Sequence, residues 1–273
     1  MRATTNMNNP LVSIITVVYN GEKHIEQTIN SVLNQTYSDI EYIIIDGASK
    51  DNTLNIIKKY EDKIAQFVSE KDSGIYNAMN KGLALAKGEI IGILNADDYY
   101  FENTLQQVVN VFSTSQSDIV YGNMVKLRAI QNKDYLKEVA PNISLIERTM
   151  PIFHPSTFVK KTVYEKIGNF NEKYQLAADY DFIYRAYKNN INFEYIPQPL
   201  TVFRVDGISS INCQSYKEGY KILVTHGSPY DKEMKRLVLK CKIKTIFRTV
   251  FNFFIRIFGL KKWNENRLIK KWK

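Results

Sequence analysis

Two adjacent carboxylates, Asp97 and Asp98, follow a short apolar segment at residues 90–94. A run of this kind is typical of a buried strand. Adjacent carboxylates repel each other unless a cation lies beside them. Mg²⁺ usually takes one or two protein carboxylates and completes its octahedral shell with water and substrate phosphates. The pair therefore predicts a divalent cation holding a phosphorylated ligand, unless it only caps a helix expected to begin near Asn103.

Polar side chains also end the two preceding apolar segments. Tyr19 follows residues 11–18, and Asp46 follows residues 42–45. Between the segments, apolar residues such as those at 25, 29, 32 and 33 recur at helical spacing. Strands alternating with helices predict a largely parallel sheet, which binds ligands beyond the carboxyl ends of its strands. We therefore expect the three strand ends to form one site.

The pattern becomes less regular after about residue 113. We expect strands at 119–121, 156–159, 193–196 and 200–204, and a helix at 179–188. No low-complexity linker separates the two parts. The sequence thus predicts a flexible stretch at 1–9 and one domain at 10–212, with halves at 10–112 and 113–212.

Composition and charge restrict the class of protein. The chain has 273 residues, 44% of them hydrophobic, and a net charge of +9. Residues 232–273 hold 14 Lys and Arg against two acids, whereas residues 1–231 hold 23 against 26. A basic tail on a mildly acidic body suggests an anionic surface as partner rather than nucleic acid, for which no recognisable module is present. Cys213 and Cys241 form no C-x-x-C motif, so we expect neither a disulfide nor a zinc site, and a reducing cytoplasm fits best.

Four segments together resemble the family 2 glycosyltransferases, which have the GT-A fold. They are residues 12–20, the Asp46-Gly47-Ala48-Ser49 loop with Asp51 and Thr53, residues 70–82, and Asn95-Ala96-Asp97-Asp98. Their order and spacing are specific, and the resemblance covers roughly residues 10–210. It implies an α/β fold in which helices flank a mostly parallel central sheet, followed here by a C-terminal helical extension.

The resemblance also implies a nucleotide-sugar donor, with a UDP-sugar favoured, and roles for individual residues. Tyr19 and Asp46 would contact uracil and ribose, and Asp72 would help to close that pocket. Asp97 and Asp98 would hold Mg²⁺ or Mn²⁺ on the diphosphate. Turn-forming or core roles are the alternatives for Tyr19, Asp46 and Asp51.

Two residues depart from the family pattern. Gly47 stands where many relatives carry Asp, so a contact to the base must come from elsewhere. Asn95 replaces the first Asp of the usual D-x-D, which shifts the expected ligand role toward Asp98.

Transfer to a hydroxyl requires a base, and Asp179 is the candidate that alignment to the family favours. Asp179 and Asp181 are two residues apart on a helix, so they point about 200° from one another and only one can face the donor. His154 corresponds to an acceptor-lining segment, although a satisfied, partly buried His would also fit. Arg204 would contact the diphosphate, but Asp206 stands where many relatives have His. A single displacement would invert the configuration of a transferred hexosyl or N-acetylhexosaminyl group and give a β-glycoside.

The tail predicts a basic amphipathic helix. Residues 213–240 are predicted to form a helical extension, and residues 241–273 a basic amphipathic helix. The apolar stripe predicted within the tail is Ile243, Ile246, Phe247, Val250, Phe251, Phe254, Ile257 and Phe258. Basic residues flank it, which indicates a helix lying on the inner face of the cytoplasmic membrane. The alternative is packing on its own domain or on a second copy in a homodimer. A peripheral cytoplasmic enzyme would meet glycan or polyprenyl-diphosphate-linked acceptors, as in cell-surface polysaccharide or lipopolysaccharide synthesis.

Two other functions remain open. Sugar nucleotidyltransferases have a similar sheet, but their first loop is typically Gly-rich, whereas residues 19–23 contain one Gly. A nucleotide-sugar- or carbohydrate-binding module without turnover is the non-enzymatic reading.

Overall fold

The computed structural model describes residues 9–205, 213–257 and 261–272, without the side chains of 248–263 and 271. The helices are α1 (Ile25–Leu33), α2 (Thr53–Lys58), α3 (Ile75–Leu85), α4 (Thr104–Thr114), α5 (Lys161–Ile167), α6 (Ala178–Lys188), α7 (Gln214–Thr225), α8 (Asp231–Ile257) and α9 (Lys261–Trp272). The strands are β1 (Val12–Val18), β2 (Ile40–Asp46), β3 (Gln66–Ser69), β4 (Ile90–Asn95), β5 (Tyr99–Tyr100), β6 (Ile119–Ile130), β7 (Lys133–Val139), β8 (Thr157–Lys160) and β9 (Phe193–Arg204). Short 3₁₀ turns occupy Glu61–Lys63, Ile143–Leu145 and His154–Ser156.

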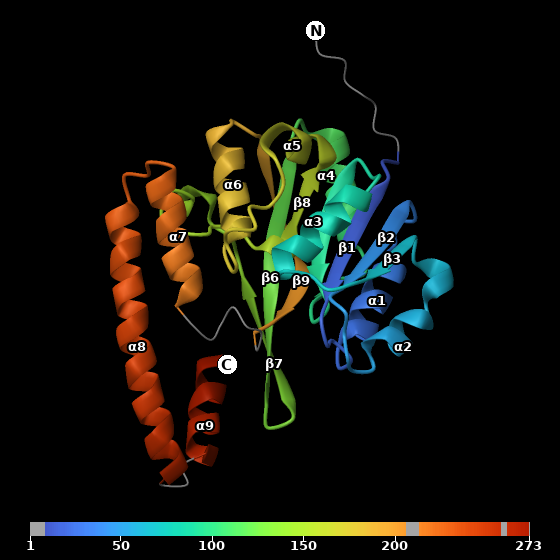
Figure 1. The fold of residues 1–273 in the computed structure, drawn as a ribbon. Coiled ribbons are helices and arrows are strands. Elements are labelled where there is room, and N and C mark those ends of the chain that lie inside the picture. The colour runs from blue at the N-terminus through green and yellow to red at the C-terminus, as the bar shows by residue number, and fades with distance from the viewer. Residues whose placement is uncertain (1–8, 206–212, 258–260, 273) are drawn as a thin grey trace.

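One sheet runs through both halves of the chain (Figure 1). Its strand order is β3-β2-β1-β4-β8-β6-β9-β5, and β7 pairs with β6. The first four strands are parallel, β8 is antiparallel to both of its neighbours, and β6 is parallel to β9. In the parallel part Val18 pairs with Asp46 and Val17 with Asn95, so the carboxyl ends of β1, β2 and β4 lie side by side.

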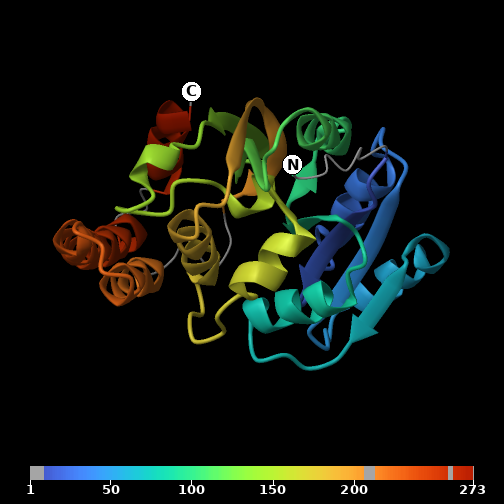
Figure 2. The same ribbon diagram turned by 90° about the horizontal axis from the view of Figure 1, so that it is seen from above.

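Helices cover both faces of this sheet. Alternate residues of β1 belong to different cores: Ile14 packs with α1, α2 and α4, whereas Ile15 packs with α3, α5 and α6. Figure 2 shows α1 and α4 on the opposite side of the sheet from α3 and α5. Burial on both faces explains why β1, β2 and β4 are continuous apolar runs in the sequence.

The strands predicted from those runs are confirmed, and the half at residues 113–212 is more regular than expected. The segments predicted at 193–196 and 200–204 are one strand, β9, and β6 is extended beyond residue 121 to Ile130. The sequence pattern missed β7 because most of its residues are exposed, so no apolar face marks it. The flexible stretch predicted at 1–9 lies outside the described residues except for Asn9.

The prediction of no disulfide is wrong. Cys213, just before α7, is bonded to Cys241 in α8. The two helices pack against each other as an antiparallel pair beside α6 (Figure 1). Sequence spacing alone could not reveal the bond, because 28 residues separate the cysteines and only this packing brings them together.

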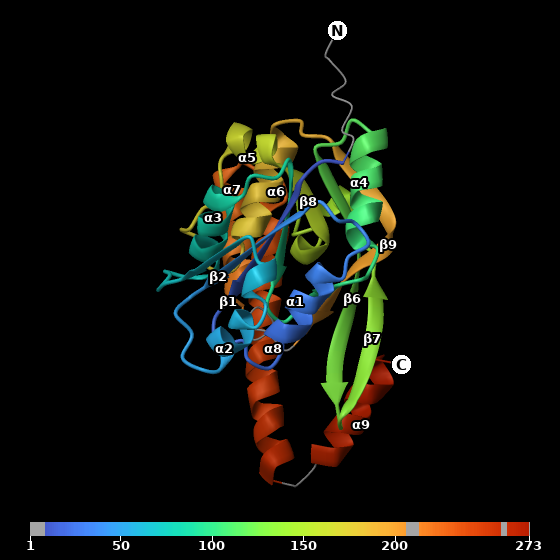
Figure 3. The ribbon, with the colours of Figure 1, turned by 90° about the vertical axis from the view of Figure 1, so that its right-hand side faces the viewer.

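The predicted apolar stripe is exposed as far as its side chains are described. The exposed fractions of Ile243, Ile246 and Phe247 are 46%, 65% and 70%. The remaining stripe residues have no described side chains. Instead of one continuous tail helix there are two, and α9 turns back to contact the β6–β7 hairpin (Figures 1 and 3). Among the described residues, no helix is both long and apolar enough to cross a bilayer.

Candidate active site

The loops after β1 and β2 are tied together by hydrogen bonds. The backbone N–H of Asn20 donates to Ser49 Oγ at 2.8 Å, and its side-chain oxygen accepts from the Lys50 N–H at 2.8 Å. The Gly21 N–H donates to Thr53 Oγ1 at 2.8 Å. These bonds hold open a surface on which the Tyr19 ring is 61% exposed. Its exposure excludes the core role and leaves the ring available for stacking.

Asp46 lies underneath this surface and is fully buried. Its Oδ2 accepts from the Ser49 N–H at 3.0 Å and from Ser69 Oγ at 2.6 Å. Its Oδ1 has no hydrogen-bond partner among the described residues. The Oδ2 atom of Asp46 therefore holds the loop in place, while the Oδ1 atom remains an unused hydrogen-bond acceptor among the described residues.

Asp72 fills the space left by Gly47. A Cβ placed on Gly47 would lie 2.5 Å from Asp72 Oδ2 and 3.5 Å from Cδ2 of Tyr19. The other carboxyl oxygen, Oδ1, accepts from the Gly74 N–H at 3.0 Å and so fixes the side chain at the start of α3. Asp72, from another loop, thus places a carboxylate in the space that a side chain at position 47 would occupy.

Asp97 and Asp98 differ in access to the surface. Asp98 is fully buried, and its Oδ1 accepts from the Arg204 N–H at 3.1 Å. Burial, and then the charge of Asp97, raise the pKa of Asp98 well above its ordinary value. Asp97 is partly exposed, and burial raises the pKa of its carboxyl against the opposing effects of its own backbone, His24 and Arg204.

Two nitrogen-bearing side chains, Arg204 and His24, lie near Asp97. Arg204, at the end of β9, donates to Gln27 Oε1 at 2.5 Å, and its Nε is buried without a partner among the described residues. Burial and the positive charge of Arg204 lower the pKa of His24, a residue that the sequence pattern did not indicate. His24 precedes α1 and carries no recognisable motif signal, so only the fold places it here.

The oxygen atoms at the end of β4 suit a hard cation. No group of three or more His, Cys, Asp or Glu side chains that could hold a metal is found in the described part of the chain. Mg²⁺ needs no such cage, because it binds through one or two carboxylates and substrate phosphates. Asp97 offers a partly exposed carboxylate, and Asn95 Oδ1 is buried with no described partner. This donor set fits a diphosphate-bound cation.

The structure separates Asp179 from Asp181 on α6. Asp181 is buried, and its carboxylate contacts Arg185 Nε at 2.8 Å and His226 Nε2 at 3.1 Å. Asp179 is partly exposed and accepts from the hydroxyl of Tyr76 at 3.0 Å. Since Tyr76 is the second residue of α3, this bond connects Asp179 to the helix that starts just beyond Asp72. Asp181 therefore has a structural environment, whereas Asp179 remains accessible.

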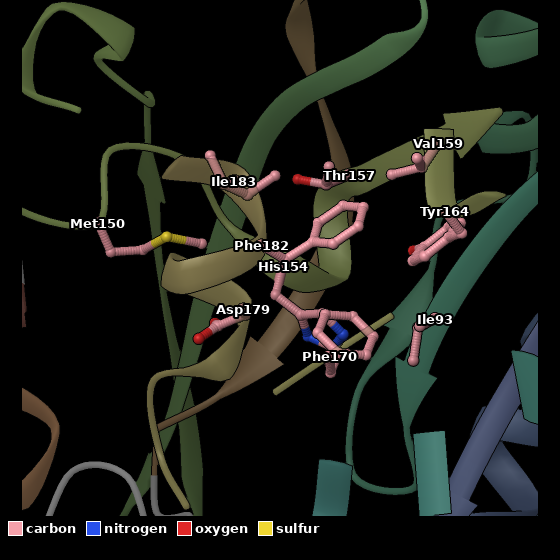
Figure 4. Close-up of a pocket in the computed structure, with 10 residues that line it drawn as sticks. All are labelled: Ile93, Met150, His154, Thr157, Val159, Tyr164, Phe170, Asp179, Phe182 and Ile183. Carbon is pink, nitrogen blue, oxygen red and sulfur yellow. The ribbon is translucent and has the colours of Figure 1, made fainter. Parts of the chain in front are cut away.

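A mostly apolar cavity lies beside Asp179 (Figure 4). The ionisable residues that line it are His154, Asp179 and Tyr164. Ile93 of β4 also lines it. Burial lowers the pKa of His154, with Asp179 opposing the shift, and its Nε2 has no partner among the described residues. His154 is thus a neutral ring with one nitrogen left unpaired, unlike the satisfied histidine that was the alternative.

Comparison with known proteins places this site in a family. The model of "Glycosyl transferase family 2" matches residues 13–192. The chain belongs to glycosyl transferase family 2. A relative from Rickettsia felis, described as an uncharacterized glycosyltransferase, is 34% identical over 192 residues, which are 66% of this chain but 32% of that protein. A PGL/p-HBAD biosynthesis glycosyltransferase of Mycobacterium bovis is 29% identical, over 66% of this chain and 71% of its own. The chain thus spans about a third of the first relative's length.

Solved structures show the same GT-A fold. Staphylococcus aureus TarS in complex with UDP superposes with a TM-score of 0.62 at 23% identity, covering 78% of this chain and 64% of TarS. The mannosyltransferase PcManGT of Pyrobaculum calidifontis, in complex with GDP-Man and Mn²⁺, gives a TM-score of 0.62 at 18% identity, with 99% and 86% covered. The predicted fold class is therefore confirmed.

Proposed function

We propose that this chain transfers a hexosyl or N-acetylhexosaminyl group from a UDP-sugar to a hydroxyl of a glycan or lipid-linked acceptor in cell-surface polysaccharide or lipopolysaccharide synthesis. The observation that carries the proposal is the hydrogen bond between Tyr76 and Asp179. It joins the helix that follows Asp72, on the donor side, to the candidate base. A base next to the donor loops is the arrangement that glycosyl transfer needs.

On the donor side, we assign stacking on the base to Tyr19 and a hydrogen bond to the base to Asp72. Asp97 and Asn95 would hold Mg²⁺ or Mn²⁺, and the bound ion would stabilise negative charge on the departing diphosphate. Arg204 supplies further positive charge beside Asp97. Because Asp98 is fully buried, the proposal gives the main ligand role to Asp97 and makes Asp98 the residue that fixes β9 behind it. This reverses the ranking expected from the sequence.

On the acceptor side, Asp179 would take the proton from the acceptor hydroxyl. The hydroxyl oxygen bonds to the anomeric carbon as the bond from that carbon to the diphosphate oxygen breaks, so the configuration inverts. Tyr76 holds Asp179 Oδ1 and leaves its other oxygen for the acceptor. His154, neutral and unpaired at Nε2, would orient the acceptor sugar by a hydrogen bond.

The tail supports a location at a membrane surface. Ile243, Ile246 and Phe247 expose apolar area on α8, within a tail whose net charge is +12. Such a combination favours the surface of an anionic bilayer. Replacing Ile246 and Phe247 with Glu is expected to abolish co-sedimentation with vesicles containing phosphatidylglycerol. The matched control is Leu136→Glu, an exposed apolar residue on β7, and equal loss in both variants would contradict the assignment.

A panel of nucleotide-sugars tests the activity itself. The expected result is release of nucleoside diphosphate, stimulated by Mn²⁺ or Mg²⁺, from one UDP-sugar above all others. Pyrophosphate exchange with nucleoside triphosphate would instead identify a nucleotidyltransferase. Donor binding without product release, even with membrane extracts as acceptor source, would identify a binding module.

A further inference from the structure

Two lysines face each other on the β6–β7 hairpin. Lys126 of β6 pairs directly with Lys137 of β7 in the antiparallel register. Directly opposed side chains share one face of the sheet with Cβ atoms about 5 Å apart, and like charges in such a pair are destabilising. The Lys126–Lys137 pair is therefore expected to destabilise the hairpin unless another group compensates its charge.

The acidic residues of the hairpin do not neutralise this pair. Asp134 and Glu138 lie at alternate positions of β7 and therefore project from the other face. Glu138 instead accepts from the Asn123 side chain at 2.6 Å. In the described part of the chain, no carboxylate lies within ion-pair distance of Lys126 or Lys137.

Lys126 is also half-buried, which makes its charge more costly. Burial, followed by the charge of Lys137, lowers the pKa of the Lys126 ammonium. An anion bound between the two side chains would oppose both effects, because a nearby opposite charge favours the ionised form of an ammonium group.

The pair lies close to the 3₁₀ turn that carries His154. The Nζ of Lys126 is 6.0 Å from the ring centroid of Phe153, the residue that precedes His154. Ser156 Oγ donates to the Asn123 carbonyl at 3.1 Å, which fastens the 3₁₀ turn carrying His154 to β6. An anion held by Lys126 would thus lie on the same side of β6 as the turn that carries His154.

The far end of the same hairpin reaches the basic tail. The Arg128 guanidinium is 5.3 Å from the Trp272 ring centroid, and Gln131 donates to Glu265 of α9 at 2.9 Å. Figures 1 and 3 show α9 lying alongside the hairpin, which projects beyond the body of the sheet. The hairpin therefore extends from the turn that carries His154 to α9 in the basic tail.

We propose that Lys126 and Lys137 bind the phosphate or diphosphate through which the acceptor sugar is attached to its lipid. This inference rests on the proposed transfer to a lipid-linked acceptor and specifies its charged group. Two ammonium groups on one face match the several oxygens of a diphosphate, with Lys acting as a point charge. The donor diphosphate is assigned elsewhere, to the end of β4 and Arg204, so the pair adds a second anion site.

Farnesyl diphosphate is a suitable probe, because it carries the proposed charged group without needing the correct sugar. We expect Lys126→Gln and Lys137→Gln each to raise its Kd about tenfold, equivalent to about 1.4 kcal/mol. Farnesol should bind weakly and equally to all variants. Lys166→Gln and Lys173→Gln, which remove exposed lysines outside the hairpin, are the matched controls. Thermal melting of each variant checks the fold, and removing one member of a repelling pair should not lower it.

The outcomes distinguish the sources of phosphate. Unchanged farnesyl diphosphate affinity in the double variant overturns the proposal. The proposal is also overturned if the lysine variants lose only co-sedimentation with phosphatidylglycerol vesicles, because the pair would then bind lipid headgroups. If donor turnover is absent in the unmodified chain while the lysine-dependent binding persists, the proposed function fails and the anion site stands.

Discussion

We predict that Asp72 supplies the carboxylate that residue 47 lacks, and variants that move this carboxylate from residue 72 to residue 47 test the prediction. Because a Cβ at Gly47 would lie 2.5 Å from Asp72 Oδ2, Gly47→Asp forces Asp72 outward and places two carboxylates together. Asp72→Ala removes the acceptor altogether. A hydrogen bond to a charged group is worth roughly 1.5–3 kcal/mol, so each single variant should weaken UDP binding about 10- to 100-fold.

The double variant, Gly47→Asp with Asp72→Ala, should recover most of this loss. It removes the clash and leaves a single carboxylate, now carried by residue 47. Asp72→Asn serves as a second test, since it keeps an acceptor for the Gly74 N–H but offers no second carboxyl oxygen to the base. Isothermal titration with UDP measures all four variants, and Asp62→Ala, on an exposed turn, is the control.

Additive losses of UDP-binding free energy in the two single variants would refute this prediction. If the double variant binds UDP as weakly as the sum of the two single losses predicts, the two positions do not share one carboxylate site. An unchanged affinity in Asp72→Ala would equally show that Asp72 does not contact the base.

Three further predictions follow from the site and its surroundings. Asp179→Asn should reduce the transfer rate about 100- to 10,000-fold and leave the free energy of unfolding almost unchanged, whereas Asp181→Asn should chiefly lower the free energy of unfolding. Steady-state kinetics measure the first effect and urea unfolding the second. The reverse pattern would make Asp181 the base. Reduction of the bond between Cys213 and Cys241 should lower the free energy of unfolding by roughly 3–4 kcal/mol, and titration of two free thiols in the untreated protein would count against the bond. Because burial lowers the pKa of His154, the unfolded state binds the proton more readily, so stability should fall as pH drops below about 6.5. His154→Gln should reduce that fall in urea titrations at pH 7 and 5, and an identical pH dependence would contradict it.

The sequence predicted the parallel half of the fold well because burial on both faces leaves an unbroken apolar signal. β1, β2 and β4 are the clearest cases, and their paired ends bring Tyr19, Asp46 and Asn95 to one edge of the sheet. The antiparallel and exposed elements carry no such signal. β7 is mostly solvent-exposed. Its partner β6 is buried over most of its length, but Gly122, Asn123, Lys126 and Arg128 interrupt its apolar run in the sequence.

The candidate site was predictable where a residue's role depends on local spacing. Helix geometry predicted that only one of Asp179 and Asp181 can face the donor, and alignment to the family favoured Asp179; in the structure Asp181 is buried and Asp179 is partly exposed. Roles set by contacts distant in sequence were not predictable. Asp72 filling the space at Gly47, and Asp98 lying buried against β9, both require strands and loops to be placed in three dimensions.

The central claim is that a cation held at the end of β4 assists departure of the nucleoside diphosphate. The most direct measurement is the rate of UDP release, with Mn²⁺ present, from the preferred donor in the unmodified chain and in Asp97→Asn. The account predicts a loss of at least about 100-fold in Asp97→Asn, because this side chain helps to stabilise the leaving group's charge, and no loss in Asp62→Asn. Retention of the full Mn²⁺-dependent rate by Asp97→Asn would contradict it.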